Sequence, residues 1–422
     1  MTDWSGRLLE VEVGAPGHGG FCVARADGRV VFVRHALPGE RVRALVTEDA
    51  GGSFCRADAV EVLTASADRV APPCPHAGPG RCGGCDWQHS SGPAQRALKA
   101  AVVREQFARL AGLEVDLDTV EELPGGLLGW RTRVLFAVDP QGRTGLHRHR
   151  SHDIEPLTAC PLGVAGVAGA PHPPDGVTGI EAAVGDADVA DVTVLAHRPG
   201  PGRQARGQRP PDQVQVVSGP ERLRHRLGER AFEVSAAGFW QVHPDALSTF
   251  AAAVLAVTAP RPGETALDLY AGAGPLTAVL ADAVGATGRV LGIESSRQAV
   301  ADAAENLADL PWARVEQGRI TPDLLNGLDF RPDVVVMDPP RAGAGAAVMA
   351  AVLGRNPRCV AYLSCDPATL ARDVRAAVGR GWRLRTLRAF DAFPMTSHVE
   401  CLALLVPDTA AGVDVGRYTD PR

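Results

Sequence analysis

The residue best suited to covalent chemistry is a cysteine that follows a short apolar run. Cys365 stands one residue beyond the apolar run 360–363, and Asp366 and Pro367, which follow it, are residue types that begin a helix. A thiol at that end of a helix faces the positive end of the helix dipole, which is expected to lower its pKa and favour the thiolate. Cys365 is therefore a candidate nucleophile. The alternative is a buried, unreactive core cysteine.

Two carboxylates stand at the ends of other apolar runs. Asp338 follows the apolar run 334–337 and is itself followed by two prolines, which stop a strand and leave a rigid rim that suits a planar base. The alternative is a rigid turn without a ligand. Glu400 enters the apolar run 401–405. A carboxylate that close to the interior of a strand must be paired or have a functional role.

Residues 264–275 predict a strand, a glycine turn and the start of a helix. A dinucleotide fingerprint is excluded, because Thr277 stands where its third glycine would follow Gly272 and Gly274. The looser glycine turn of S-adenosylmethionine-binding sheets fits. Glu294, at the end of the next predicted strand, can accept hydrogen bonds from both ribose hydroxyls of such a ligand. The alternative for Glu294 is a helix cap or a surface acid.

Four of the nine cysteines are candidate metal ligands. Cys74, Cys82 and Cys85 share a Gly/Pro-rich loop, and Cys160 is the fourth candidate. In the cytoplasmic setting that we expect, they should not form disulfides. Four thiolates suit either a tetrahedral zinc ion or an iron–sulfur cluster, and the spacing alone does not choose between the two.

The chain is expected to be a multidomain α/β protein. Residues 1–65 should form a small β-barrel, because four strand-like runs surround the glycine-rich break 14–20. They resemble a TRAM-type, OB-like RNA-binding module, with a purely packing role as the alternative. Residues 66–230 should form a central, mostly antiparallel β domain with the cysteine loop, and the periodicity predicts a helix over 93–112 within it.

The second half has a different composition. Residues 231–408 should form a Rossmann-like methyltransferase domain, with a helix from about 245 to 258, and residues 409–422 a flexible tail. The Gly/Pro-rich stretches 164–190 and 197–213 are expected to be loops.

The charge and hydropathy of the sequence indicate which classes of partner the chain can bind. The net charge of −6 does not by itself indicate nucleic-acid binding. Locally, however, the predicted strands 130–138 and 143–150 are rich in arginine, which favours phosphate contacts. Residues 198–230 hold eight arginines against three acids, either a second basic patch or a solvated loop. We see neither a signal peptide nor an apolar stretch of about 20 residues. A cytoplasmic, monomeric protein without membrane contact is expected.

Taken together, these motifs resemble the RNA uracil-C5 methyltransferase family over nearly the whole chain. The likeness rests on the cysteine loop and on five further motifs: 239–241, 268–272, 338–343, 364–373 and 398–400. The resemblance implies Cys365 as nucleophile and Glu400 as base. It implies that Gln241, Tyr270, Glu294 and Asp338 contact S-adenosylmethionine. It also implies that Cys74, Cys82, Cys85 and Cys160 hold a [4Fe–4S] cluster rather than zinc.

Two positions depart from the family pattern. Seven residues separate Cys74 from Cys82, more than is usual, and Pro275 stands where a small polar residue often contacts the methyl donor.

The implied activity is methylation of uridine C5 in structured RNA through a covalent adduct between Cys365 and uracil C6. Ribosomal RNA is favoured over transfer RNA because the β module and the cysteine loop are present. Two alternatives remain. An RNA cytosine-C5 methyltransferase would normally carry a second cysteine in a Pro-Cys pair where this chain has Asp338-Pro-Pro. A non-catalytic RNA-binding protein would not need Cys365 and Glu400 together.

Overall fold

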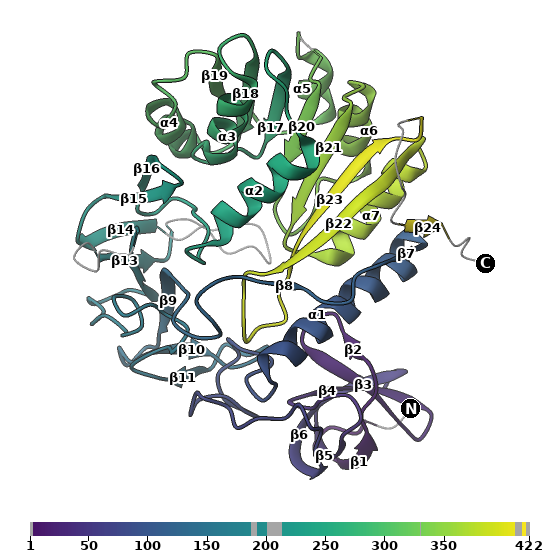
Figure 1. Cartoon of the computed structure of the whole chain (residues 1–422). Helices are drawn as coiled ribbons and strands as arrows, with labels where there is room; N and C mark the ends of the chain where they lie inside the picture. The colour runs from purple at the N-terminus through teal and green to yellow at the C-terminus, as the bar shows by residue number, and fades with distance from the viewer. Residues whose placement is uncertain (1–2, 187–191, 201–212, 330, 410–415, 419–422) are drawn as a thin grey trace.

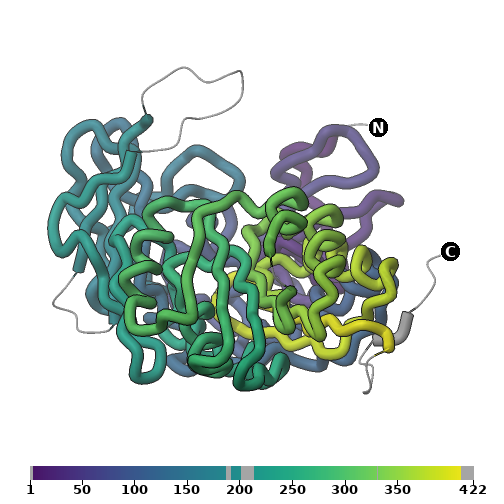
Figure 2. The backbone as a smooth tube through the Cα atoms, turned by 90° about the horizontal axis from the view of Figure 1, so that it is seen from above, coloured from purple at the N-terminus to yellow at the C-terminus, as the bar shows by residue number. Residues whose placement is uncertain are grey.

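The computed structural model describes residues 3–186, 192–200, 213–329, 331–409 and 416–418. Within these residues the strands form one eight-stranded sheet, two six-stranded sheets and two pairs of strands (Figure 1). Seen from above, the N-terminal and central sheets lie toward opposite ends of the molecule, beside the C-terminal part (Figure 2). None of the helices in the described ranges is long and apolar enough to cross a membrane.

The N-terminal sheet has the strand order β1-β5-β6-β4-β3-β2. Its strands are β1 (Leu8–Glu12), β2 (Pro16–Gly17), β3 (Phe21–Ala26), β4 (Arg29–Arg34), β5 (Arg41–Glu48) and β6 (Phe54–Thr64). The alternation of small apolar side chains buries one face of the sheet. The four predicted strands are present, and β2 and β3 are two that sequence analysis missed. Among the described residues, the end strands β1 and β2 are not paired with each other.

The central sheet is antiparallel, in the order β11-β10-β9-β12-β13-β14. Its strands are β9 (Arg133–Val138), β10 (Thr144–His147), β11 (Ile154–Pro156), β12 (Gly179–Ala183), β13 (Thr193–Arg198) and β14 (Gln213–Ser218). A separate hairpin follows, made of β15 (Arg222–Leu227) and β16 (Arg230–Ser235). Because β12 lies at the centre of this sheet, the expectation that 164–190 is all loop was wrong. Residues 201–212 lie outside the described residues.

The C-terminal sheet has the order β19-β18-β17-β20-β21-β23-β22-β8. Its parallel strands are β17 (Thr265–Leu269), β18 (Arg289–Glu294), β19 (Ala313–Gln317), β20 (Val334–Met337) and β21 (Cys359–Ser364). The strand β23 (Glu400–Pro407) is antiparallel to β21 and to β22 (Trp382–Asp391), and β8 (Glu121–Glu122) extends the far edge. The helices are α2 (Ala246–Thr258), α3 (Pro275–Val284), α4 (Arg297–Asn306), α5 (Pro322–Gly327), α6 (Ala346–Gly354) and α7 (Pro367–Val378).

Each face of this sheet has its own apolar core. Leu267 and Leu269 point to the side that α6 and α7 cover, whereas Ala266 points to the side of α2 and α3. The first core also includes α1 (Gly92–Gln106), which continues into a π-helical turn, η1 (Phe107–Ala111). The predicted helix over 93–112 is therefore present. It was assigned to the central domain, but it packs on the C-terminal sheet.

The chain end also differs from the expected flexible tail. Residues 416–418 form β24 (Gly416–Tyr418), which pairs antiparallel with β7 (Leu113–Val115) behind η1. Residues 410–415 and 419–422 lie outside the described residues. A tail of this composition gives no strand signal of its own, and only the partner strand, about 300 residues away in sequence, defines it.

Candidate active site

The six side chains predicted for catalysis and methyl-donor binding all border one cavity of about 1000 Å³. They are Gln241, Tyr270, Glu294, Asp338, Cys365 and Glu400. Four of them lie at or just after the carboxyl ends of β17, β18, β20 and β21, the edge where open parallel sheets bind ligands.

Strand pairing explains how Glu400 reaches the same edge. Because β23 runs antiparallel to β21, it begins where β21 ends, and Ser364 pairs with Cys401. The next residue on one strand is Cys365 and the preceding one on the other is Glu400. The thiol and the carboxylate therefore border the same end of the cavity, although 34 positions separate them in the chain.

The two carboxyl groups at this end of the cavity have raised pKa values. Glu400 is 5% exposed, and burial raises its pKa well above the usual value; the neighbouring Asp338 raises it further, and Arg341 opposes both effects. Burial also raises the pKa of Asp338 to about 6. A carboxyl group with a raised pKa is a stronger base, once it is ionised, than a carboxyl group with the usual pKa.

The expected lowering of the Cys365 pKa was wrong for the ligand-free protein. Burial raises its pKa to about 11, and Glu400 and Asp338 raise it too, while Arg341 lowers it. Asp366 caps α7: its carboxylate accepts a hydrogen bond from the Thr369 amide at 2.8 Å. The thiol is therefore neutral until a ligand changes its surroundings.

This pKa gives a pH-dependent prediction for the ligand-free protein. At pH 8 only about one Cys365 in a thousand should be a thiolate, so alkylation by iodoacetamide should be slow and should accelerate about tenfold per pH unit up to about pH 10. Replacing Arg341 by Ala should slow it further, since Arg341 favours the thiolate. Mass spectrometry of the peptide that contains Cys365 measures the rate; a pH-independent rate would contradict the assignment.

The methyl-donor side is built on the ends of β17 and β18. The Glu294 carboxylate accepts hydrogen bonds from the amides of Gly272 at 3.1 Å and Ser296 at 2.7 Å, which hold it at the cavity wall. Tyr270 and Gly272 adopt positive φ angles of 68° and 56°, so the turn bends sharply and exposes its backbone to the cavity. A fixed carboxylate beside an open glycine turn fits the adenosyl ribose of S-adenosylmethionine.

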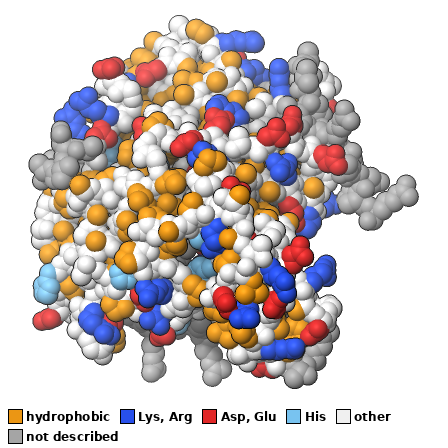
Figure 3. All heavy atoms as spheres, turned by 60° about the horizontal axis from the view of Figure 1, so that its bottom comes forward, with side chains coloured by type: hydrophobic (Ala, Val, Ile, Leu, Met, Phe, Trp, Pro, Cys, Tyr) orange, Lys and Arg blue, Asp and Glu red, His pale blue; other side chains and the backbone are white. Residues whose placement is uncertain are grey.

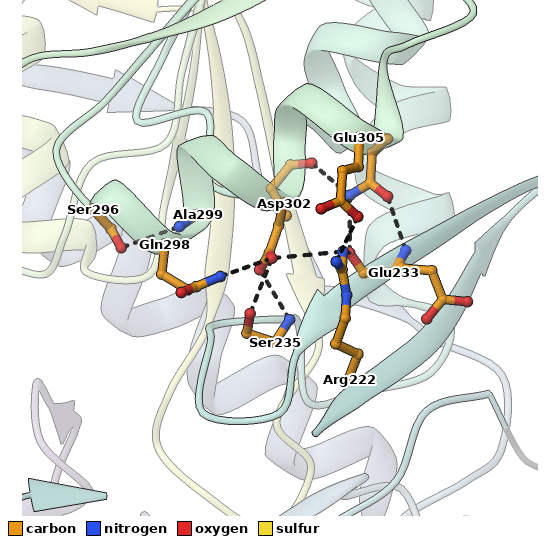
Figure 4. Close-up of polar contacts among 10 residues, drawn as sticks. Arg222, Glu233, Ser235, Ser296, Gln298, Ala299, Asp302 and Glu305 are labelled. Atoms are coloured by element: carbon orange, nitrogen blue, oxygen red, sulfur yellow. Dashed lines mark hydrogen bonds and ion pairs between the residues drawn. The ribbon is translucent and has the colours of Figure 1, made fainter. Parts of the chain in front are cut away.

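A polar network fixes the outer rim of this side (Figure 4). The buried Asp302 of α4 accepts hydrogen bonds from the Ser235 amide at 2.9 Å and from the Gln298 side chain at 3.2 Å. Arg222 of the β15–β16 hairpin lies 3.6 Å from Asp302 and also pairs with Glu305. The hairpin and α4 are thereby locked together at the mouth of the cavity.

The loop before Glu400 is held from two other parts of the chain. The buried Lys99 of α1 contacts Asp391 at 2.5 Å and donates a hydrogen bond to the Phe393 carbonyl at 2.9 Å. Asp86, beside Cys85, accepts a hydrogen bond from the Ser397 amide at 2.9 Å. The segment that carries Glu400 is therefore positioned by α1 and by the cysteine loop.

Removing the Lys99 charge should strongly destabilise the fold. Lys99→Met leaves Asp391 buried without its cation, and we expect a loss of about 3–5 kcal/mol in the free energy of unfolding, measured by urea denaturation. Lys99→Met combined with Asp391→Leu removes both charges and should restore much of the loss. A double variant no more stable than Lys99→Met would contradict this account.

The four predicted cysteines also come together. Cys74, Cys82, Cys85 and Cys160 border one small cavity, and burial raises the pKa of the last three, to about 12 for Cys85. Two N–H groups point at sulfur: Gln88 Nε2 lies 3.1 Å from Cys85 Sγ, and the Gly84 amide 3.4 Å from Cys82 Sγ. Across the described ranges, however, no three His, Cys, Asp or Glu side chains are arranged to hold a metal ion.

Among the further residues that border the active-site cavity are Arg131, which belongs to the arginine-rich strand predicted to contact phosphate, and three residues that were not assigned a role from sequence: Phe239, Arg341 and His398. Phe239 is 71% exposed, and Arg341 lies 3.4 Å from His398 Nε2. Burial lowers the pKa of His398 to about 4, so its ring is neutral. Three of the four stand inside motifs that carry the family resemblance. The motifs were recognised, but the sequence alone did not show that these side chains face the cavity.

Comparison with known proteins agrees with this architecture. The family model "tRNA (Uracil-5-)-methyltransferase" matches residues 231–407, and the TRAM domain model matches residues 5–60. An uncharacterized RNA methyltransferase of Streptomyces coelicolor is 48% identical, with 95% of this chain and 93% of that protein aligned. A 23S rRNA (uracil(1939)-C(5))-methyltransferase of Thiobacillus denitrificans is 34% identical over 92% of this chain and 97% of its own.

Among solved structures, the tRNA (uracil-54, C5)-methyltransferase of Pyrococcus abyssi, in complex with S-adenosyl-L-homocysteine, has a TM-score of 0.68. It covers 94% of this chain and 100% of its own length at 20% identity, which shows a shared fold.

The fold and site thus define an S-adenosylmethionine-dependent methyltransferase with an N-terminal TRAM domain. The two relatives described above are named as an RNA methyltransferase and a 23S rRNA methyltransferase. The chain belongs to the RNA (uracil-C5)-methyltransferase family.

Proposed function

We propose that the protein methylates C5 of one uridine in a structured RNA through a covalent adduct between Cys365 and uracil C6. The observation that carries this proposal is the position of Cys365 and Glu400, side by side at one end of the cavity that Glu294 and Tyr270 border at the other. Methylation at C5 requires a nucleophile and a base close together, with the methyl donor within reach of both.

The chemistry follows from the weak nucleophilicity of uracil C5. The Cys365 thiolate adds to C6, the electron pair moves onto the C5–C4–O4 enolate, and C5 becomes nucleophilic. S-adenosylmethionine, when bound, supplies the methyl group as an electrophile. Glu400 then removes the remaining proton from C5, the C5=C6 bond re-forms, and the thiolate leaves. Such a base contributes about 10²–10⁴-fold to the rate.

Both groups react as anions. Burial disfavours the anions of the Cys365 thiol and of the Glu400 carboxyl in the ligand-free protein, and Arg341 is the neighbour that favours the anion of both. We assign Arg341 the role of stabilising these anions. Gln241, Tyr270, Glu294 and Asp338 are assigned to the methyl donor, with the Glu294 carboxylate on the ribose hydroxyls.

Ribosomal RNA is the favoured substrate class. A relative at 34% identity that aligns over nearly its whole length is named for a 23S rRNA uridine, whereas the transfer-RNA enzyme shares the fold at 20% identity. The target base must be flipped out of its stack to reach Cys365. A cytosine-C5 enzyme is disfavoured because Pro339 and Pro340, rather than Pro-Cys, follow Asp338.

The decisive experiment is to map 5-methyluridine in ribosomal and transfer RNA from cells with and without this gene. We expect one ribosomal position to lose the modification and to regain it when the purified enzyme and S-adenosylmethionine are added. Loss at a transfer-RNA position would reassign the substrate, and no loss at any uridine would refute the function.

We also propose that Cys74, Cys82, Cys85 and Cys160 hold a [4Fe–4S] cluster. The support is the shared cavity of the four thiols and the N–H groups directed at two sulfurs, a pattern that stabilises thiolate ligands. A four-iron cluster is larger than an ion, so its ligands stand further apart than those of zinc.

Cluster loading can be tested without an activity assay. Anaerobically purified protein is expected to contain iron and sulfide and to show broad visible absorption that bleaches on reduction. The Cys160→Ser variant should lose the iron and sulfide and the visible absorption. The Cys359→Ser variant, which changes a buried cysteine of β21, should retain them. Stoichiometric zinc without iron would overturn the cluster assignment.

A further inference from the structure

One buried carboxylate of the C-terminal domain has no part in the proposed reaction. Asp373 stands on α7, eight residues after Cys365, and ends the motif 364–373. Acidic side chains of a soluble protein lie mostly at its surface, as those on the face in Figure 3 do, but Asp373 is 5% exposed. A buried carboxylate needs hydrogen-bond donors to replace water, so its partners show what it holds in place.

The Asp373 carboxylate holds the start of α6. Its Oδ2 atom accepts hydrogen bonds from the amides of Ala344 at 2.9 Å and Gly345 at 3.1 Å. The hydroxyl of Tyr362, a fully buried residue of β21, donates to the same atom at 2.7 Å and accepts a hydrogen bond from the Ala344 amide at 3.0 Å. Gly345 precedes α6 and has no side chain to cap it, so Asp373 supplies this acceptor from a neighbouring helix.

Gly343 leaves the space that this carboxylate occupies. Its φ angle is 77°, and a Cβ atom on it would lie 2.8 Å from Asp373 Oδ2 and 3.1 Å from Thr369 Cβ. Any larger residue would therefore push the loop away from α7. Gly343 ends the motif 338–343 and Asp373 ends the motif 364–373, so the two motifs contact each other in the fold.

The loop that Asp373 holds carries Arg341. It connects β20 with α6, and within it the Gly343 amide donates a hydrogen bond to the Pro340 carbonyl at 2.8 Å. This bond closes a turn with Arg341 and Ala342 at its two central positions. Because the last residue of the turn packs on Asp373 and the next two residues donate to it, Asp373 fixes the direction in which the turn presents Arg341.

The position of Arg341 matters for both reacting groups. Its Nη2 atom lies 3.4 Å from His398 Nε2 at the cavity, and its charge lowers the pKa of the Cys365 thiol and of the Glu400 carboxyl. Such an effect weakens as the distance between the charges grows. A small displacement of the turn would therefore leave both anions less stabilised.

We propose that Asp373 is a positioning residue: by holding residues 343–345 against α7, it keeps Arg341 at the end of the cavity where Cys365 and Glu400 lie. Asp373 acts only through Arg341, since it is not among the described residues that border the cavity. The inference rests on the proposed function for what Arg341 contributes to the reaction. The state of the Cys365 thiol can nevertheless be measured without RNA or methyl donor.

The sign of the effect separates positioning from a direct effect of the Asp373 charge. Removing a nearby negative charge favours the thiolate of Cys365 and would make its alkylation faster. Unfolding would also expose the thiol and make alkylation faster. Displacement of Arg341 disfavours the thiolate and makes alkylation slower. The charged groups that act on the Cys365 thiol are Glu400 of β23 and Asp338 and Arg341, which follow β20, and the groups that face Asp373 are Tyr362 and Tyr270.

The test is the rate at which iodoacetamide alkylates Cys365 in the ligand-free full chain at pH 8, followed by mass spectrometry. Asp373→Ala should slow alkylation about threefold to tenfold, the latter being the effect of one pKa unit. Asp373→Asn keeps an oxygen acceptor and should recover much of the wild-type rate. Asp373→Ala combined with Arg341→Ala should react no more slowly than Arg341→Ala alone, because both changes remove the same interaction.

Gly343→Ala is a second route to the same displacement, for use if Asp373→Ala does not fold, and it should slow alkylation as well. The matched control is Glu264→Ala. The Glu264 carboxylate accepts hydrogen bonds from Arg358 Nε and Nη2, both at 2.7 Å, beside the first residue of β17 at the amino end of the parallel strands, away from Cys365. Its loss should cost stability but leave the alkylation rate of Cys365 at the wild-type value.

Three outcomes would overturn the proposal: an unchanged or faster rate in folded Asp373→Ala, a double variant that reacts more slowly than Arg341→Ala, or an equal slowing in Glu264→Ala. Methyl transfer to RNA from cells without the gene is measured on the same proteins. If the wild type transfers no methyl group but alkylation follows the expected pattern, the proposed reaction fails and the positioning role stands.

Discussion

Cys365→Ala is expected to abolish methyl transfer, with a loss on the order of 10⁴-fold or more, the scale observed when a catalytic nucleophile is removed. Without the sulfur, no covalent bond to C6 can form, and uracil C5 does not become nucleophilic. The measurement is transfer of a tritiated methyl group from S-adenosylmethionine to RNA from cells that lack the gene. Binding of the methyl donor, followed by calorimetry, should change little, because Glu294 and Tyr270 are untouched.

Cys359→Ala is the matched control. Cys359 is the buried first residue of β21, whereas Cys365 directly follows the last residue of that strand and is partly buried. The same truncation there should cost some stability and leave turnover per folded molecule close to wild type. Normal turnover in Cys365→Ala, or an equal loss in both variants, would contradict covalent catalysis by Cys365.

The parts of the site that sequence analysis found are those that local patterns specify. The runs before Asp338 and Cys365 read as strands because they are short, apolar and bounded by Pro or helix-start signals, and β20 and β21 end where those signals stand. Glu400 was found because it is a carboxylate at the start of an apolar run. Once β21 and β23 pair, these residues must share one edge of the sheet.

The parts that it missed depend on pairing across long sequence separations. The stretch that contains β12 (Gly179–Ala183) is Gly- and Ala-rich and lacks alternation, because all five residues of the strand are buried in the structure. Sequence gave no sign that α1 packs on the C-terminal sheet through the Lys99–Asp391 pair, whose partners are 292 residues apart. The Cys365 pKa was misjudged because its burial and the carboxylates beside it come from other strands.

Several long-range contacts converge on the short loop that precedes Glu400. The Met395 carbonyl accepts hydrogen bonds from the amides of Asp86 and Trp87, each at 3.0 Å, and its own amide donates to Gln95 at 2.8 Å. Met395 has a positive φ of 68°, a conformation that such contacts can hold. The cysteine loop and α1 thus fix the backbone that leads to Glu400.

Glu400→Gln is expected to stop the reaction after methyl transfer and to accumulate a covalent protein–RNA adduct. Gln keeps the size of the side chain but cannot accept the C5 proton, so the C6–sulfur bond cannot be broken by elimination, and turnover should fall by about 10²–10⁴-fold. A denaturing gel should show a slow band that carries the tritiated methyl group. The double variant Cys365→Ala/Glu400→Gln should give no band, because it lacks the sulfur that forms the bond.

Alkylation of the same variant separates the two roles of Glu400, as a base in the reaction and as a charge that acts on Cys365. The Glu400 carboxyl helps to raise the pKa of Cys365, so Glu400→Gln should lower that pKa, and alkylation of the ligand-free thiol at pH 8 should become faster, not slower. If the thiol of Cys365 reacts faster although turnover is lost, the defect lies after the addition of Cys365 to C6. Intact turnover without an adduct would remove Glu400 as the base, and a slower alkylation would show that it does not act on Cys365 electrostatically.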